Sequence, residues 1–218
     1  MKTVTLLVMA TSVFAQIDKD QLALKINAAD EVNTKSLMQY IWKRKSDVYG
    51  DGQLKLTALT EFSFDEAGKL QAKTIDAQTT VKQKGGLRGR AQQSAMEDKA
   101  DYIEKALQLS IAYTFMTKGQ LLDFMNKATI TESPGVIEAT AGDVYVKGDK
   151  LTVRVDSKTN LYLGKKFSSL LGKDPIDGEI AYEKFSSGTN HATTTVLNMP
   201  AQKMKIDAKN QDYTVRVK

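Results

Sequence analysis

Apolar residues recur every three or four positions over residues 18–35, near the N-terminal end of the chain. They are Leu22, Ile26, Ala29 and Val32. This spacing places them on one face of an α-helix. Asp18 and Gln21 are spaced as in a capping box, in which an N-cap side chain satisfies a free backbone N–H of the first turn. The pattern predicts an amphipathic helix that begins next to Asp18.

A second helical pattern occupies the middle of the chain. Its apolar stripe consists of Met96, Ala100, Ile103, Leu107, Ile111 and Phe115. Ser94 and Glu97 form a capping box at its start. Three more apolar residues near its end lie on a second side: Leu109, Tyr113 and Met116. We therefore expect a helix from Ser94 whose stripe belongs to the core, followed by a short helix over 120–127.

Elsewhere apolar and polar residues alternate, which is typical of half-buried β-strands. The clearest case is the set Leu54, Leu56, Ala58, Phe62 and Phe64, which shares one face of a strand. Turns rich in Gly, Asn and Asp separate the alternating segments. Strands are predicted at 41–48, 54–64, 70–75, 144–147, 151–156, 161–167, 177–185, 191–198, 203–207 and 213–218. One apolar and one polar face indicate antiparallel pairing.

The order of these elements predicts an α+β fold. Helices lie before and inside a run of antiparallel strands, so we expect one sheet with the N-terminal helix and the middle helices on its apolar face. No repeat of 20–50 residues divides the chain. A single domain is expected over residues 16–218, with an internal connector at 81–93.

Residues 1–15 have the composition of a secretory signal peptide. One Lys at position 2 precedes an uncharged, mostly apolar run, and Val13 and Ala15 are small residues that a signal peptidase accepts. The alternative is an N-terminal membrane anchor, but the run is about half of the ~20 residues that a span needs. We expect cleavage before Gln16 and a periplasmic or secreted protein with no transmembrane segment in the mature chain.

The composition excludes several kinds of active site. There is no Cys, which rules out disulfides, thiolate metal ligands and thiol nucleophiles. The single histidine, His191, lies in a strand-like stretch with no catalytic motif around it. No cofactor or metal site is predicted, and a carboxylate-based hydrolase stays open only if Asp and Glu side chains converge in the folded chain. The net charge of +5 is too small to indicate a nucleic-acid partner.

The segment VKQKGGLRGR, residues 81–90, combines three Gly residues with four cations. The cations are Lys82, Lys84, Arg88 and Arg90. The glycines lack P-loop spacing, and the segment has no aromatic residue to stack on bases. Because glycine gives backbone freedom and like charges repel one another, we predict a flexible, exposed connector. Its cations are also candidates for contact with anionic lipid headgroups or an acidic partner.

A signal peptide, a helix leading into a strand with Tyr40-Ile41-Trp42, a meander, a helical insertion and a second meander together resemble the bacterial outer-membrane lipoprotein carrier (LolA/LolB-like) superfamily. The chain also looks like an uncharacterised family of secreted bacterial proteins. The carrier resemblance implies a curved antiparallel sheet, an incomplete barrel, with helices on its concave face and a cavity for acyl chains. It also implies a gating arginine, for which position alone does not choose between Arg44 and Arg154.

A soluble exported carrier or binding protein is the leading hypothesis, with a lipid or lipoprotein acyl chain as ligand. The candidate ligand-binding residues are Trp42, Phe62, Phe64, Leu107, Ile111, Phe115 and Met125. Trp42 is expected in the core, with Lys43, Arg44 and Lys45 on the wet face. The alternative is a structural or interaction protein of the envelope, with a protein partner and a filled core. An apolar pocket of roughly 300 Å³ or more would favour the carrier.

Overall fold

The fold is that of a computed structural model, which describes residues 18–80 and 86–216 and, for residues 86–96, the backbone alone. The expected signal peptide and its cleavage site lie outside the described residues, as do Lys82 and Lys84 and the side chains of Arg88 and Arg90. No helix within the described ranges is long and apolar enough to cross a membrane.

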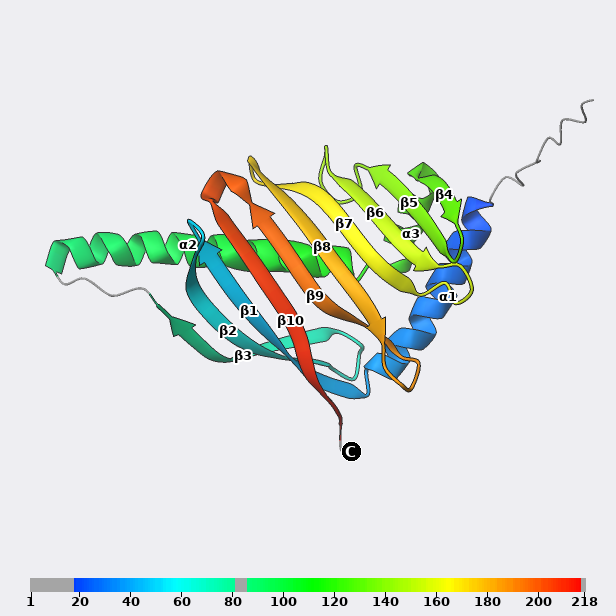
Figure 1. The fold of residues 1–218 in the computed structure, drawn as a ribbon, viewed down its shortest axis with the longest axis horizontal. Coiled ribbons are helices and arrows are strands. Elements are labelled where there is room, and N and C mark those ends of the chain that lie inside the picture. The colour runs from blue at the N-terminus through cyan, green and yellow to red at the C-terminus, as the bar shows by residue number, and fades with distance from the viewer. Residues whose placement is uncertain (1–17, 81–85, 217–218) are drawn as a thin grey trace, which may run out of the picture.

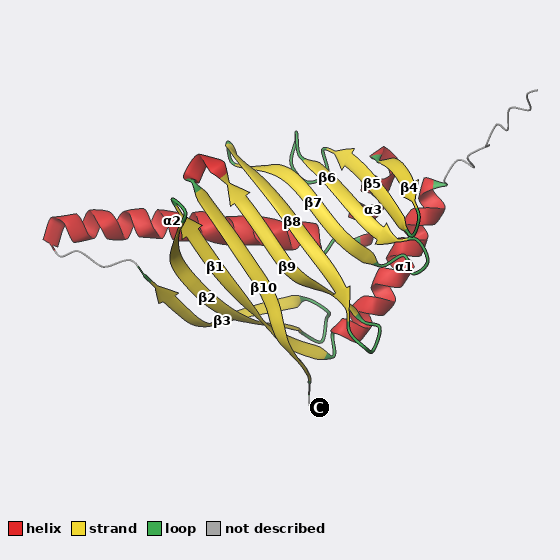
Figure 2. Ribbon diagram, viewed as in Figure 1, coloured by secondary structure: helices red, strands yellow, loops and turns green. Residues whose placement is uncertain are grey.

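In the described part of the chain, ten strands form one antiparallel sheet and three α-helices lie against one of its faces (Figures 1 and 2). The helices are α1 (Lys19–Leu37), α2 (Gly86–Thr114) and α3 (Lys118–Lys127), with a 3-10 turn η1 (Pro200–Gln202). The strands are β1 (Tyr40–Gly50), β2 (Gln53–Phe64), β3 (Leu70–Thr79), β4 (Thr129–Ser133), β5 (Val136–Gly142), β6 (Lys150–Asp156), β7 (Tyr162–Leu171), β8 (Asp174–Lys184), β9 (Asn190–Met199) and β10 (Met204–Val215).

The strand order is β3-β2-β1-β10-β9-β8-β7-β6-β5-β4, so the first and last strands of the chain pair inside the sheet. The edge strands β3 and β4 lie at opposite ends of a curved, open sheet (Figure 1). The predicted α+β class, with a curved antiparallel sheet and helices on its concave face, is confirmed.

Helix α1 begins as predicted, since the Asp18 side chain accepts from the backbone N–H of Gln21 at 3.0 Å. It buries Leu22 and Ile26, but Val32 is 67% exposed and does not belong to the buried face. The next residue, Asn33, makes the contact with the sheet instead. Its Nδ2 donates to the carbonyl oxygen of Asn190 at 2.9 Å, and its Oδ1 accepts from the N–H of the same residue at 2.6 Å.

Helix α2 begins at Gly86, so the predicted N-cap at Ser94 is wrong. The Leu, Arg, Ala and Gln residues before Ser94 are good helix formers, and they extend the helix despite two glycines. The helix therefore starts inside the predicted connector, of which residues 81–85 are not described.

The segment 129–149 differs from the predicted pattern in two ways. Strands β4 and β5 form a hairpin that is not among the predicted strands. The strand predicted at 144–147 is a loop, because the Asp149 carboxylate accepts the backbone N–H groups of residues 144–146 and the hydroxyl of Tyr113. A carboxylate that collects these donors holds the backbone in a turn, away from a strand partner.

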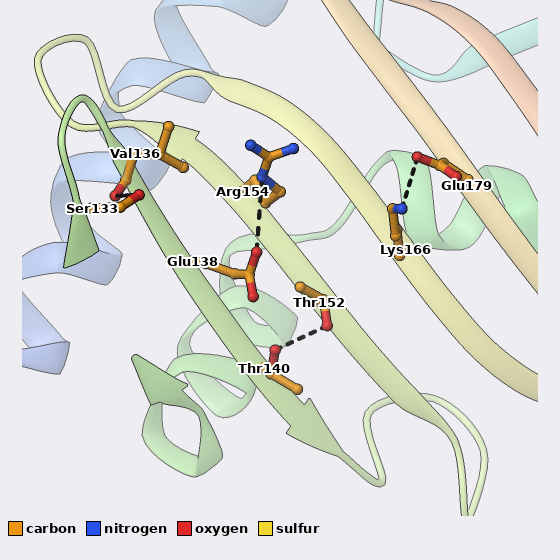
Figure 3. Close-up of polar contacts among 8 residues, drawn as sticks. All are labelled: Ser133, Val136, Glu138, Thr140, Thr152, Arg154, Lys166 and Glu179. Carbon is orange, nitrogen blue, oxygen red and sulfur yellow. Dashed lines mark hydrogen bonds and ion pairs between the residues drawn. The ribbon is translucent and has the colours of Figure 1, made fainter. Parts of the chain in front are cut away.

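The face of the sheet that points away from the helices carries opposite charges on neighbouring strands (Figure 3). Arg154 lies opposite Glu138, with Nε 3.8 Å from Oε2, and Lys166 lies opposite Glu179, with Nζ 3.1 Å from Oε1. Such exposed cross-strand pairs contribute about 0.2–1 kcal/mol each. Arg154 therefore belongs to a solvated face on the far side of the sheet from the helices.

The helix-covered face is filled over β6 to β9. Its large inward side chains, each at most 3% exposed, are Leu151, Val153, Phe167, Ile176, Ile180 and Leu197. Tyr113 of α2 stacks on Phe167 with ring centroids 4.0 Å apart. Phe167 also covers Gly178, its partner on β8, where an added Cβ would lie 2.1 Å from Cζ of the ring. Glycine is therefore required beneath the Tyr113–Phe167 stack.

One charged side chain, Lys165, points into this core and attaches α2 to the sheet. Its Nζ donates to the carbonyl oxygens of Tyr113 at 3.1 Å and Thr114 at 2.8 Å, at the C-terminal end of the helix. The ammonium also lies 3.9 Å from the ring centroid of Tyr162. These carbonyls form the negative end of the helix dipole. Lys165 thus caps α2 from the opposite layer of the fold.

We expect Gly178→Ala to lower the free energy of unfolding by about 1–3 kcal/mol, the usual cost of overpacking. The added methyl group forces the ring of Phe167 out of its stack with Tyr113. Urea denaturation measures the change. Gly164→Ala on β7 is the control, since its Cβ would lie 3.4 Å from the carbonyl oxygen of Ile180. Equal losses in the two variants would contradict this packing.

The contribution of Lys165 to stability should depend on pH, because burial lowers its pKa from 10.5 to about 7. Between these values the unfolded chain binds the proton and the native state does not, so raising the pH favours the native state. The stability of the wild-type protein relative to Lys165→Met should therefore rise from about pH 7 to about pH 10. Urea unfolding across this range measures it, with Lys166→Met as the exposed control. A difference that stays flat or falls would refute the prediction.

Candidate functional site

Small inward-facing side chains distinguish strands β1–β3 from the filled half of the sheet. They are Ser46, Ala58, Thr60, Ala72 and Thr74. Helix α2 lies opposite these strands, but its side chains do not fill the space left by the small residues. A pocket of about 1000 Å³ remains between α2 and strands β1–β3. The space exceeds the threshold that favours a carrier over a protein with a filled core.

The two apolar sides of α2 have different surroundings. The predicted stripe, represented by Ile103, Leu107 and Ile111, lines the pocket and is only partly buried. On the predicted second side, Tyr113 and Met116 are buried in the main core and Leu109 is partly buried against it. The expectation that the stripe belongs to the core therefore holds in part: its residues pack against the core clusters on one side and line the pocket on the other.

The pocket has two chemically different ends. Its outer end is bordered by polar residues near the β1–β2 turn and on α2: Asp51, Lys55, Lys99 and Gln202. Its inner end is formed by Arg44, Phe62 and Ile111. The distance along α2 from Lys99 to Ile111 corresponds to roughly 18 Å at the helical rise. The site is thus an elongated space with an apolar wall and a cation at its inner end.

Arg44 is a buried cation, 5% exposed, and its predicted place on the wet face is wrong. Strand alternation puts residue 44 on the same face as Trp42, which turns both side chains inward. The Nε atom donates to Oδ1 of Asn210 at 2.8 Å, and Cζ lies 4.8 Å from the ring centroid of Phe62. Burial lowers the pKa of Arg44 to about 10, so the guanidinium remains protonated at neutral pH.

Phe62 connects the pocket to an aromatic cluster behind it. Trp42 lies between Phe62 and Tyr213, at centroid distances of 5.8 and 5.6 Å, and both rings are stacked on the indole. Phe64 meets Phe115 edge to face at 6.0 Å. These contacts hold Phe62 in place, so the inner wall of the pocket is supported by packed rings.

The predicted ligand-binding residues occupy three places. Phe62, Leu107 and Ile111 line the pocket. Trp42, Phe64 and Phe115 belong to the aromatic cluster behind it. Met125 lies on α3 in the main core and is 1% exposed. The small strand residues of the pocket are absent from the prediction, although their alternation opposite an apolar helix is visible in the sequence.

Other candidate chemistry is sparse. His191 is buried on β9 and stacks on Phe185 with centroids 3.8 Å apart, and burial lowers its pKa. The described ranges contain no group of three or more His, Cys, Asp or Glu side chains that could hold a metal ion. Arg154, the other arginine considered for gating, lies on the outer face of the sheet (Figure 3).

Comparison with known proteins finds similarity in structure. No protein-family model matches the chain, and no curated protein matches its sequence. The structure is similar to a DUF1329 family protein from Desulfovibrio piger, with a TM-score of 0.41 and 11% identity over 91% of this chain and 92% of that chain. It is also similar to a LolA superfamily protein from Nitrosomonas europaea, with a TM-score of 0.37 and 14% identity over 89% and 94% of the two chains.

A third similar structure is a domain from Vibrio parahaemolyticus described as an outer membrane lipoprotein-sorting protein domain. It has a TM-score of 0.36 and 11% identity over 89% of this chain and 94% of that chain. These are similarities of structure at low sequence identity, and two of the three structures are described in words that match the predicted resemblance. We base the functional proposal on the pocket itself.

Two Ala→Leu substitutions on α2 test whether the pocket is open. Ala106 is completely buried in the core, so Ala106→Leu should lower the free energy of unfolding by about 1–3 kcal/mol through overpacking. Ala100 lines the pocket, so Ala100→Leu should change stability by less than about 0.5 kcal/mol. Both residues lie in α2, so the difference in helix propensity between Ala and Leu is the same at the two positions. Urea denaturation measures the free energy of unfolding of both variants. A large loss at Ala100 would show that this space is filled.

Proposed function

We propose that the protein is a non-enzymatic carrier or binding protein that holds an apolar or lipid-like ligand between α2 and strands β1–β3. The observation that carries this proposal is a pocket of about 1000 Å³ with Phe62, Leu107 and Ile111 on its walls. Small-molecule sites typically measure roughly 300–1000 Å³ and are mostly apolar.

The pocket provides a driving force for binding an acyl chain. Each methylene group that moves from water into an apolar site contributes about 0.8 kcal/mol. The small residues of the strands supply the volume, and the stripe on α2 supplies the apolar contact. Binding also buries the partly exposed apolar stripe of α2, which contributes further favourable free energy because a bound chain removes these side chains from water.

The proposed cargo is a lipid or the acyl chain of a lipoprotein, carried in the periplasm or outside the cell. An export signal, predicted at residues 1–15, fits a protein that moves apolar cargo through an aqueous compartment.

The N-terminal end of α2 projects past the sheet (Figure 1), and the outer end of the pocket lies on the same side, at Lys99. We propose that the cations of residues 81–90, Lys82, Lys84, Arg88 and Arg90, contact the anionic headgroups of a lipid surface, separate from the bound cargo. An envelope protein that delivers or receives the cargo is a further proposed partner.

Titration with neutral monoacylglycerols of increasing chain length tests the carrier function. Trp42 is the single tryptophan, and its stacking on Phe62 makes its fluorescence sensitive to occupation of the inner end. Affinity should rise roughly fourfold for each added methylene until the pocket is full. Absence of saturable binding at every chain length would refute the proposal.

A matched pair of variants locates the binding. Ala58→Phe fills the pocket and should weaken binding at least about tenfold, as expected if roughly two methylenes lose their place. Leu59→Phe is the control, since Leu59 is the cross-strand partner of Lys45 on the outer face of the sheet. Undiminished binding in Ala58→Phe would place the ligand elsewhere.

A further inference from the structure

The inner end of the pocket contains a buried positive charge without a negative partner. Arg44 is 5% exposed and lines the pocket. Its Nε donates to the neutral side chain of Asn210, and the ring of Phe62 lies beside the guanidinium. Among the described residues, Arg44 takes part in no ion pair, so no carboxylate of that part of the chain neutralises it.

The surrounding structure holds the guanidinium in this position. Asn210 is itself fixed, because its Nδ2 donates to the carbonyl oxygen of Ala192 at 2.7 Å. Arg44 projects from β1, which is paired on both sides, by β2 and β10. A buried charge without compensation is costly, and arginine does not relieve that cost by losing its proton at neutral pH. Its terminal NH2 groups make no hydrogen bond to the described residues and remain available as donors.

We propose that the ligand is an amphiphile whose anionic group, a carboxylate or a phosphate, binds Arg44 while its apolar chain lies along Leu107 toward the outer end. This inference rests on the proposed carrier function and specifies its ligand. The guanidinium presents paired N–H donors that match the oxygens of both groups. An anionic group would neutralise the buried guanidinium. A purely apolar ligand would instead remove the remaining water from the guanidinium and leave its charge uncompensated.

The lysines at the outer end are weaker partners for the anion. Lys99 is exposed, and the Nζ of Lys55 already donates to Oε1 of Gln53 at 2.8 Å. Exposed charges are screened by salt and contribute little. A headgroup held there would also leave Arg44 unpaired beneath the acyl chain. The charge distribution therefore favours a ligand that enters with its anionic group first.

Isothermal titration calorimetry with tetradecanoate, tetradecyl phosphate and tetradecan-1-ol tests this orientation, because the three probes share one chain. At least one anion should bind the wild-type protein about tenfold or more tightly than the alcohol. Arg44→Gln should abolish this preference and leave the affinity for the alcohol within about threefold. Lys45→Gln is the control, since it removes a cation from the next position of β1, on the outer face. The two anions together distinguish a carboxylate from a phosphate ligand.

Equal affinity of the wild-type protein for all three probes would overturn the anionic assignment and leave the carrier function standing. An anion preference that survives in Arg44→Gln but disappears in Lys55→Gln/Lys99→Gln would also overturn it, by placing the anion at the outer end. If none of the probes binds, the carrier function fails together with this inference. Arg44→Lys, which keeps the charge, should retain part of the preference. If Arg44→Gln does not fold, the wild-type protein and Lys55→Gln/Lys99→Gln decide the matter: an anion preference present in the first and lost in the second would overturn the assignment, and one kept in both supports it.

Discussion

The attachment of the C-terminal half of α2 to the sheet is the interaction on which the rest of the structure depends. Tyr113 stacks on Phe167, and Lys165 donates to the last carbonyls of the helix. Both contacts come from β7, in the filled half of the sheet. These contacts fix the distance and direction of α2 relative to the sheet. The N-terminal half of α2 lies opposite β1–β3 without comparable packing, and the pocket lies between the two.

Side-chain size, rather than a gap in the backbone, creates the pocket. The inward positions over β6 to β9 carry Leu, Ile, Val and Phe, whereas those beneath the pocket include the small side chains Ser46, Ala58, Thr60, Ala72 and Thr74. Filling inward positions with large side chains is the usual way to stabilise a core. Small side chains at inward positions beside an apolar helix do not provide this stabilisation. A bound acyl chain can provide it instead. We regard this as the physical link between the fold and the proposed function.

Two basic side chains point inward from the sheet, and their surroundings give them different roles. Lys165 meets the carbonyl end of α2, so its donors are used within the fold. Arg44 meets one amide oxygen and an aromatic ring, and its terminal NH2 groups make no hydrogen bond to the described residues. A charge satisfied by the chain acts as a structural cap, whereas a charge left unsatisfied at a pocket wall acts as a recognition group. The contrast explains why we assign recognition of the anionic group to Arg44 and not to Lys165.

Local patterns in the sequence determined most of the elements and the α+β class, though not the β4–β5 hairpin, because alternation and helical spacing depend only on neighbouring residues. They also indicated Phe62, Leu107 and Ile111, which the fold brings to one pocket. Alternation with Trp42 is enough to place Arg44 on the inward face, but only the tertiary structure decided which residues surround it and that residues 144–147 form a loop. Asn210 lies 166 positions from Arg44, and Tyr113 lies 36 positions from Asp149. Such partners meet through strand order and helix placement, which no local period encodes. The volume of the pocket also depends on the tertiary structure. It is the space between strands β1–β3 and helix α2 that the side chains of α2 do not occupy.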